Sequence, residues 1–102
     1  MGETFSTTGG VRVGSGIGGF NATWPFAKLK IDDDHVTVSC FTKRWTFPKA
    51  NIRKLSHHKG MISRGLRIEH DVADVNPFFV FWTLGSFPTV RAELERHGYP
   101  VA

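Results

Sequence analysis

The sequence has little cysteine, no long apolar run and no secretion signal. Cys40 is the only cysteine among 102 residues, so an internal disulfide is excluded. No apolar stretch reaches the roughly 20 residues of a membrane span, and residues 1–10 lack the basic and apolar segments of a signal peptide. These features predict a cytoplasmic protein held together by an apolar core rather than by disulfides.

Acidic residues are missing from the middle of the chain. Between His35 and Ile68 there is no Asp or Glu, although the whole chain has 9 acidic and 13 basic residues and a net charge of +4. Eight basic residues fall in this segment: Lys43, Arg44, Lys49, Arg53, Lys54, Lys59, Arg64 and Arg67. A solvated basic surface is the simpler interpretation, and an anionic partner is the alternative.

Alternating apolar and polar residues predict a chain made mainly of β-strands. The clearest case is residues 27–31, which alternate before an acidic turn at 32–34 and a returning strand at 36–40. Further strands are predicted at 11–13, 44–47, 51–59 with a bulge, 66–70 and 78–84. We expect residues 1–10 to be a flexible tail and residues 11–102 to form a single domain.

One helix is predicted at the end of the chain. Phe87, Val90 and Leu94 recur at helical spacing, and Pro88 suits the first turn. Gly98 stands where a left-handed residue commonly ends a helix. Because about eleven residues are too few for a stable isolated helix, its apolar face is expected to dock on the sheet.

The order of these elements resembles the pleckstrin-homology (PH) superfold, and in particular the small bacterial PH-like domains, over residues 11–99. The segments that carry the resemblance are residues 24–31 with the acidic turn, 44–48, 78–82 and the final helix. The resemblance implies a mainly β fold, in which seven antiparallel strands form a barrel of two near-orthogonal sheets capped by the C-terminal helix. It also implies a binding platform that associates with itself or with neighbouring proteins.

Lipid-binding relatives carry a basic residue on the first strand and a basic-x-Arg pair on the second. Arg12, Lys28 and Lys30 are the nearest matches here. Lys30 stands where the relatives have Arg, and it lacks the planar fork that holds a phosphate with two bonds. The resemblance therefore implies a candidate anion site at these positions, with a departure at its third residue.

The loop between the predicted strands at 51–59 and 66–70 is a second candidate for anion or lipid contact. Met61 and Ile62 are predicted at its tip, between Lys59 and Arg64. An apolar tip with basic flanks can enter an anionic membrane surface. The alternative is that both apolar side chains fold back onto the barrel.

The strand at 78–84 is apolar on both faces, so it is either covered twice or exposes a patch. We predict Phe79 and Phe81 on its outer face as a protein interface, joined by Trp24, Phe26 and Phe41. The alternative is that the other sheet covers them.

Patterns that could carry catalysis are weak. Residues 14–19 spell the dinucleotide pattern G-x-G-x-x-G, but no helix is predicted after them. Cys40 is predicted to be a buried, inert thiol on an apolar strand face. His57 and His58 are adjacent on a predicted strand and so point to opposite faces, which disfavours a shared metal. No catalytic residue, cofactor or metal site is predicted.

The sequence thus predicts a non-enzymatic PH-like module that mediates protein–protein interaction and self-associates. The alternative is a peripheral membrane module that binds anionic lipid through the basic, apolar-tipped loop. Nucleic acid is not expected as a partner, because most aromatic residues occupy core-type positions, and no small-molecule substrate is identified.

Overall fold

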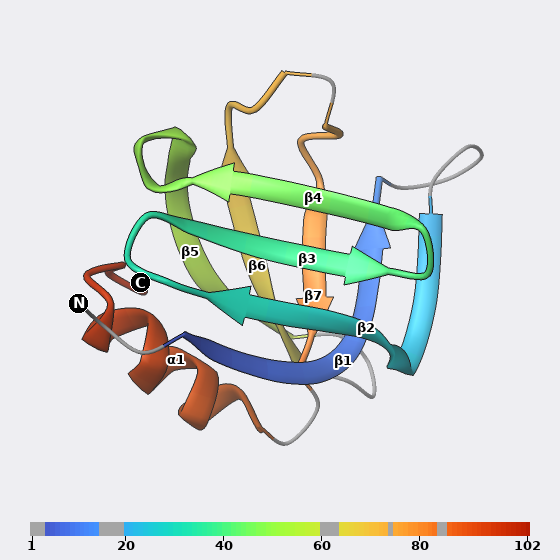
Figure 1. The fold of residues 1–102 in the computed structure, drawn as a ribbon, viewed down its shortest axis with the longest axis horizontal. Helices are drawn as coiled ribbons and strands as arrows, with labels where there is room; N and C mark the ends of the chain where they lie inside the picture. The colour runs from blue at the N-terminus through green and yellow to red at the C-terminus, as the bar shows by residue number, and fades with distance from the viewer. Residues whose placement is uncertain (1–3, 15–19, 60–63, 74, 84–85) are drawn as a thin grey trace.

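The chain folds into one seven-stranded antiparallel sheet followed by one α-helix in a computed structural model (Figure 1). The structure describes residues 4–14, 20–59, 64–73, 75–83 and 86–102. The elements are β1 (Phe5–Val13), β2 (Phe20–Ile31), β3 (His35–Cys40), β4 (Lys43–Pro48), a short 3₁₀ turn (Lys49–Asn51), β5 (Ile52–Lys59), β6 (Arg64–His70), β7 (Phe79–Trp82) and α1 (Phe87–Arg96). The predicted class, mainly β with a C-terminal helix, is confirmed.

The strand order is β4-β3-β2-β1-β7-β6-β5. Backbone hydrogen bonds therefore join all seven strands into one sheet. β4 and β5 form the two edges of this order and do not pair with each other, so the sheet is not closed over the described residues. The C-terminus covers part of one edge, because Ala102 donates a 2.8 Å backbone hydrogen bond to Leu55.

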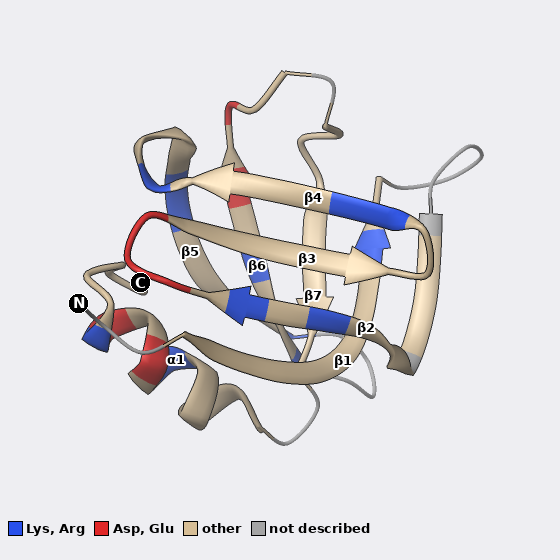
Figure 2. Ribbon diagram, in the orientation of Figure 1, with Lys and Arg blue, Asp and Glu red and all other residues tan. Residues whose placement is uncertain are grey.

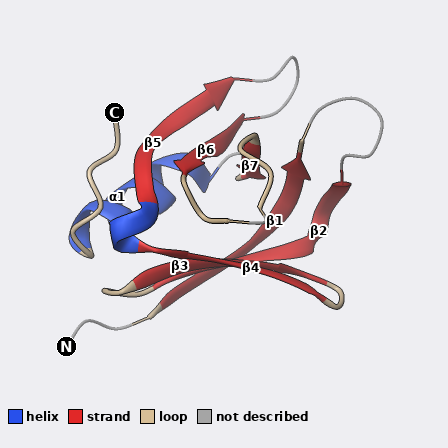
Figure 3. Cartoon of the chain, turned by 90° about the horizontal axis from the view of Figure 1, so that it is seen from above, coloured by secondary structure: helices blue, strands red, loops and turns tan. Residues whose placement is uncertain are grey.

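A bend in β1 and β2 divides the sheet into two halves. The register of β1 on β2 shifts between Gly9 and Val11, where residues 23–26 of β2 stand opposite the single residue Gly10. The first half of β1 pairs only with β2, and residues 10–13 pair with β7 as well. As a result β2, β3 and β4 cross over β5, β6 and β7 (Figures 1 and 3). The core lies between the two halves.

The position of β1 corrects the predicted domain boundary. Residues 5–10 form the first part of β1 and pair with β2 through Gly9, so they are not a tail. The sequence signal is weak because residues 6–10 are all Ser, Thr or Gly. Among the side chains of this stretch, only those of Phe5 and Thr7 are partly buried. Its place in the fold comes from hydrogen bonding to β2 rather than from apolar side chains.

The predicted helix is confirmed. Phe87, Val90 and Leu94 are buried, and Gly98 has φ 88°, the left-handed conformation expected after a helix end. The bulge in β5 is also confirmed, between Ile52 and Lys54. Cys40 is 2% exposed, and burial raises the pKa of its thiol, as expected for an inert core cysteine.

Candidate functional site

The two faces of β7 are the reverse of the prediction. Phe79 and Phe81 are both 0% exposed and belong to the core. Phe79 makes edge-on ring contacts with Phe47 and Trp45, at centroid distances of 4.8 and 5.3 Å. The prediction that Phe79 and Phe81 form an exposed interface is therefore wrong, because their rings pack in the core between the two halves of the sheet. Strand alternation places Phe78, Val80 and Trp82 on the outer face instead.

The outer face of β5–β7 carries a cluster of half-buried rings and one guanidinium, which we call the aromatic face: His58, Arg67, Phe78 and Trp82. Trp82, Gly65 and His58 lie side by side on β7, β6 and β5. The His58 ring lies 5.5 Å from the Trp82 ring and 6.0 Å from the Phe78 ring, centroid to centroid. Val80 lies on the same side of β7, between Arg12 of β1 and Arg67 of β6, and is 0% exposed.

Gly65 makes this arrangement possible. A Cβ atom at this position would lie 2.8 Å from the Phe81 carbonyl oxygen and 2.9 Å from the Trp82 ring. Such distances are well inside van der Waals contact, so only glycine lets the indole lie across β6 toward His58. The aromatic face therefore depends on one missing side chain.

Arg67 is the residue of the aromatic face whose hydrogen bonding is incomplete. Its guanidinium lies over the Phe78 ring, 4.8 Å from the centroid, in cation–π geometry. Its Nε is buried and has no hydrogen-bond partner, and it is the only such side-chain nitrogen or oxygen in the described part of the chain. Burial, then the charge of Arg67, then that of His57 lower the pKa of His58. The face thus holds a fixed positive charge with an unused donor.

The outer face of β1–β4 has a different composition. We call it the lysine face: Ser6, Thr8, Lys28, Lys30, Thr37, Ser39, Arg44 and Thr46. Strand register arranges these residues in two rows, Thr8–Lys28–Ser39–Arg44 and Ser6–Lys30–Thr37–Thr46. None of the eight is acidic, and Figure 2 shows the acidic residues of this side at the turn before β3 and on α1.

Two exposed phenylalanines stand at one end of the lysine face, and we call them the phenylalanine corner: Phe26 and Phe41. They are 54% and 76% exposed, and their rings stack at 5.6 Å and 28°. Phe41 has φ 55°, which is uncommon for a bulky residue and costs conformational energy. A hollow of about 210 Å³ beside them is lined by Thr8, Pro25, Phe26, Ala27, Lys28, Ser39, Cys40 and Phe41.

The predicted anion-binding residues are only partly brought together. Lys28 and Lys30 are exposed on the lysine face, opposite Thr8 and Ser6. Arg12 lies opposite Asn21, so it is four residues from Thr8 along β1, or roughly 13 Å at the rise of a β-strand. Arg12 instead lies beside Val80 of β7. The three residues do not form one pocket.

The predicted membrane loop is described only at its two ends. Lys59 and Arg64 are exposed and pair with each other as the last register position of β5 and β6. Met61 and Ile62 lie outside the described residues, as do residues 15–19 of the glycine-rich pattern. Trp24 is part of β2, but its side chain is not described. The loop hypothesis therefore stays a prediction.

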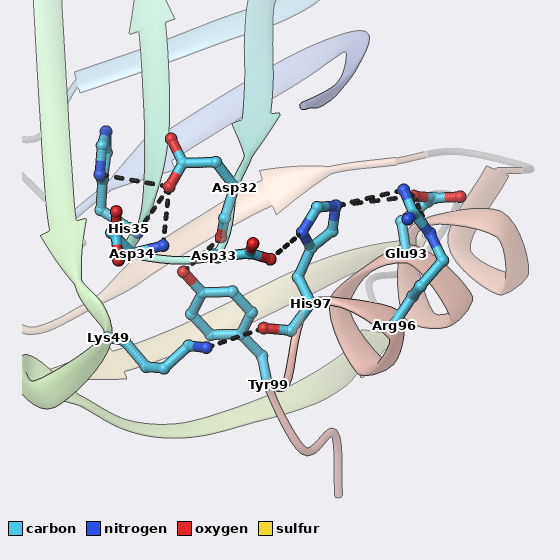
Figure 4. A network of polar contacts seen from close by, with 9 residues as sticks. All are labelled: Asp32, Asp33, Asp34, His35, Lys49, Glu93, Arg96, His97 and Tyr99. Atoms are coloured by element: carbon cyan, nitrogen blue, oxygen red, sulfur yellow. Dashed lines mark hydrogen bonds and ion pairs between the residues drawn. The ribbon is translucent and has the colours of Figure 1, made fainter. Parts of the chain in front are cut away.

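A polar network ties the acidic turn to the end of the helix (Figure 4). His97 is buried, and its Nδ1 lies 2.7 Å from an Asp33 carboxylate oxygen. Tyr99 donates a 2.8 Å hydrogen bond from its hydroxyl to the Asp32 carbonyl, and the Lys49 ammonium donates one to the His97 carbonyl. Burial, and then Asp32, Asp34 and Asp33, raise the pKa of Tyr99.

An Asp–His pair is also the arrangement that orients a general base in hydrolases. The His97 side chain is only 1% exposed, and its Nε2 faces Arg96 at 3.3 Å and Glu93 at 3.9 Å. A substrate cannot reach that nitrogen in this arrangement. We therefore assign the pair a structural role, which is to hold the helix and the C-terminal tail against the turn between β2 and β3.

The turn itself is stabilised by Asp32. Its carboxylate accepts hydrogen bonds from the backbone N–H groups of Asp34 (2.8 Å) and His35 (2.9 Å). Burial alone would raise the pKa of Asp32, but these hydrogen bonds and the nearby His35 hold the pKa below its usual value.

Sequence reasoning missed most of the aromatic face. Alternation puts Phe78 and Trp82 on one side of β7, but it does not show that this side is the outer one. Arg67 and His58 were noted only as basic and metal-candidate residues. The signal that could have found it is the cross-strand alignment of His58, Gly65 and Trp82. This alignment can be recognised only when the strand register is known.

Comparison with protein-family models, with curated proteins and with solved structures finds no match to this chain. Among the described residues, no helix has the length and apolar character needed to cross a membrane. No group of three or more His, Cys, Asp or Glu side chains in the described ranges is placed to hold a metal ion.

Proposed function

We propose that this chain is a non-enzymatic PH-like module that mediates protein–protein interaction by self-association through the aromatic face. The PH-like assignment, with its partly open barrel of two near-orthogonal layers, is supported by the strand order. That order consists of a four-stranded and a three-stranded meander joined through β1 and β7, with one C-terminal helix. The proposed interface therefore lies on the outer side of β7, whereas the sequence-predicted residues Phe79 and Phe81 are buried on its inner side.

The observation that carries the proposal is the unpaired Nε of Arg67. A buried donor without an acceptor costs about 1–3 kcal/mol, and this one belongs to a charged group fixed over Phe78. An acceptor oxygen from a partner would recover this energy once the Arg67 side chain turns so that its Nε, which the chain itself covers, faces the partner. Trp, Phe and Arg are also the residue types enriched in protein interfaces.

A second copy of the chain offers the acceptor that Arg67 lacks. Glu69 follows two residues later on β6, so strand alternation places it on the same outer face. In a two-fold contact across β6, Arg67 of each copy would meet Glu69 of the other, since such an interface is self-complementary. Glu69 lies opposite Lys54 of β5 but forms no ion pair with it or with any other described residue.

The test is the molar mass in solution, measured by light scattering over a range of concentrations. The proposal predicts a rise from the monomer mass of 11.4 kDa toward twice that value. Arg67→Glu should keep the protein monomeric, because it places two acidic groups opposite each other. Arg44→Glu, the same change on the lysine face, is the matched control and should associate like the wild type. A wild-type mass that stays at the monomer value up to millimolar concentration contradicts self-association.

A further inference from the structure

We propose that the lysine face and the phenylalanine corner together bind single-stranded nucleic acid. This site lies on the outer face of β1–β4, apart from the aromatic face, and does not depend on the proposed self-association. The sequence predicts no nucleic-acid partner, because most aromatic residues occupy core-type positions. Phe26 and Phe41 are the exceptions, since both are more than half exposed.

Charge is the first argument for this ligand. The lysine face carries three cations at registered positions, Lys28, Lys30 and Arg44, and none of its eight residues is acidic. Neighbouring positions in a row lie about 5 Å apart, and the two rows lie about 7 Å apart, as two residues along a strand do. The cations are therefore spread over the platform rather than gathered in one pocket. This arrangement suits a ligand with repeated negative charges along its length.

The exposed rings are the second argument. Base stacking on aromatic side chains, combined with a positively charged surface that follows the backbone, is how proteins bind single strands without strong sequence preference. The Phe41 ring rests on Phe26 and leaves most of its surface open at the edge of a hollow that also contains Lys28. A base placed there would have a phosphate neighbour within reach of that ammonium group.

The conformation of Phe41 is the third argument. A two-residue turn between Cys40 and Lys43 with φ 55° at its first residue favours Asn or Gly, not a bulky ring. Costly backbone conformations of this kind concentrate at binding sites. The turn therefore holds an exposed ring where folding alone would select a different residue.

The hydroxyl groups favour a nucleic acid over an anionic bilayer. Ser6, Thr8, Thr37, Ser39 and Thr46 fill the positions between the cations, so the platform can hydrogen-bond to sugars and base edges along both rows. A bilayer would use the two rings as a wedge and would leave the second row, with Lys30, unused. The observations thus favour an extended single strand.

The proposal is tested with fluorescein-labelled 12-mers of U and of dT, by fluorescence anisotropy at three salt concentrations. The wild type should bind at low salt, and its affinity should fall linearly with log salt concentration. Phe41→Asn, which suits the turn, should weaken binding by roughly 5- to 150-fold, the range of one lost base stack. Lys28→Gln should weaken binding and lower the salt slope by about 0.7. Lys54→Gln, which removes the same charge from β5, is the control and should bind like the wild type.

Several outcomes overturn the proposal. No binding at low salt does so, as does equal binding by Phe41→Asn and the wild type. Equally tight binding of a 12-bp duplex shows that charge alone acts, without stacking. If Phe41→Asn instead abolishes sedimentation with phosphatidylserine vesicles and leaves oligonucleotide binding intact, the ligand is a membrane.

Preference between the U and dT oligomers distinguishes RNA from DNA. Circular dichroism of each variant checks that it is folded.

Discussion

The outer face of β1–β4 and the outer face of β5–β7 belong to one hydrogen-bonded sheet, but their side chains meet different demands. On the lysine face, the hydroxyl side chains and the cations are exposed or half-exposed to solvent. On the aromatic face, Val80 is fully buried and the Nε of Arg67 is buried without an acceptor. An outer face can therefore be packed almost like a core and still be chemically incomplete.

The difference originates in the residues at the outer positions of the two halves and in one glycine. On the lysine face, the registered outer positions of β1–β4 are Ser, Thr, Lys or Arg. β7 has only four residues, and all of them are buried or half-buried. Gly65 then allows Trp82 to lie flat across β6. Packing on the second face is therefore tight, and substitutions should affect the two faces unequally.

Gly65→Ala should have the largest effect on stability. The added methyl group would meet the Phe81 carbonyl oxygen and Val80 Cγ1, both at 2.8 Å, and neither can move without displacing β7. We expect a loss of about 3 kcal/mol in the free energy of unfolding. Thr37→Val, on the lysine face, should change it by less than about 0.5 kcal/mol. Urea unfolding measures both, and equal losses would mean that the two faces are packed alike.

The backbone of Phe41 gives a smaller effect. Both Phe41→Asn and Phe41→Ala remove the stacked ring, so their difference isolates the cost of the left-handed turn. Because Asn adopts φ near 55° more readily than Ala, Phe41→Asn should be more stable by about 1 kcal/mol. Thermal unfolding of the pair is the measurement. Identical stability of the two variants would show that the Phe41 backbone is not strained, so the turn would give no support to a binding role for the phenylalanine corner.

The smallest effect is the pH dependence of the aromatic face. The pKa of His58 is lower in the folded protein than in the unfolded chain, where it is near 6.5. The unfolded chain therefore binds the proton more readily, so stability should fall as pH drops below about 6.5. His58→Gln should lose this part of the dependence in urea titrations at pH 5.5 and 7.5. An unchanged dependence would show that other histidines account for it.

Most strands and the helix can be predicted from the sequence because each carries apolar residues along one side only. The hairpin at 27–40, the bulged β5 and the helix face of Phe87, Val90 and Leu94 all follow this rule. Residues 5–10 were missed because small polar residues carry no such signal. The pairing of β1 with β7 also has no local signal in the sequence, because the two strands are far apart in the chain.

The candidate sites were harder to predict for a related reason. β7 is apolar on both sides, so alternation shows its two faces but not which of them is inside. Phe79 and Phe81 were therefore placed outside, although the core needs them. Phe41, predicted as part of the same interface, is exposed in the turn between β3 and β4, away from Phe79 and Phe81. The unpaired Nε of Arg67 depends on neighbours from β5 and β7, and no local pattern reveals it.

The central claim is that Arg67 of one copy pairs with Glu69 of another. The most direct measurement is a charge exchange, read by sedimentation equilibrium. Arg67→Glu and Glu69→Arg should each abolish the dimer, since each places like charges across the two-fold contact. The double variant, which restores opposite charges, should recover at least part of the wild-type association. Association that survives both single changes, or a double variant that remains monomeric while folded, would contradict the account.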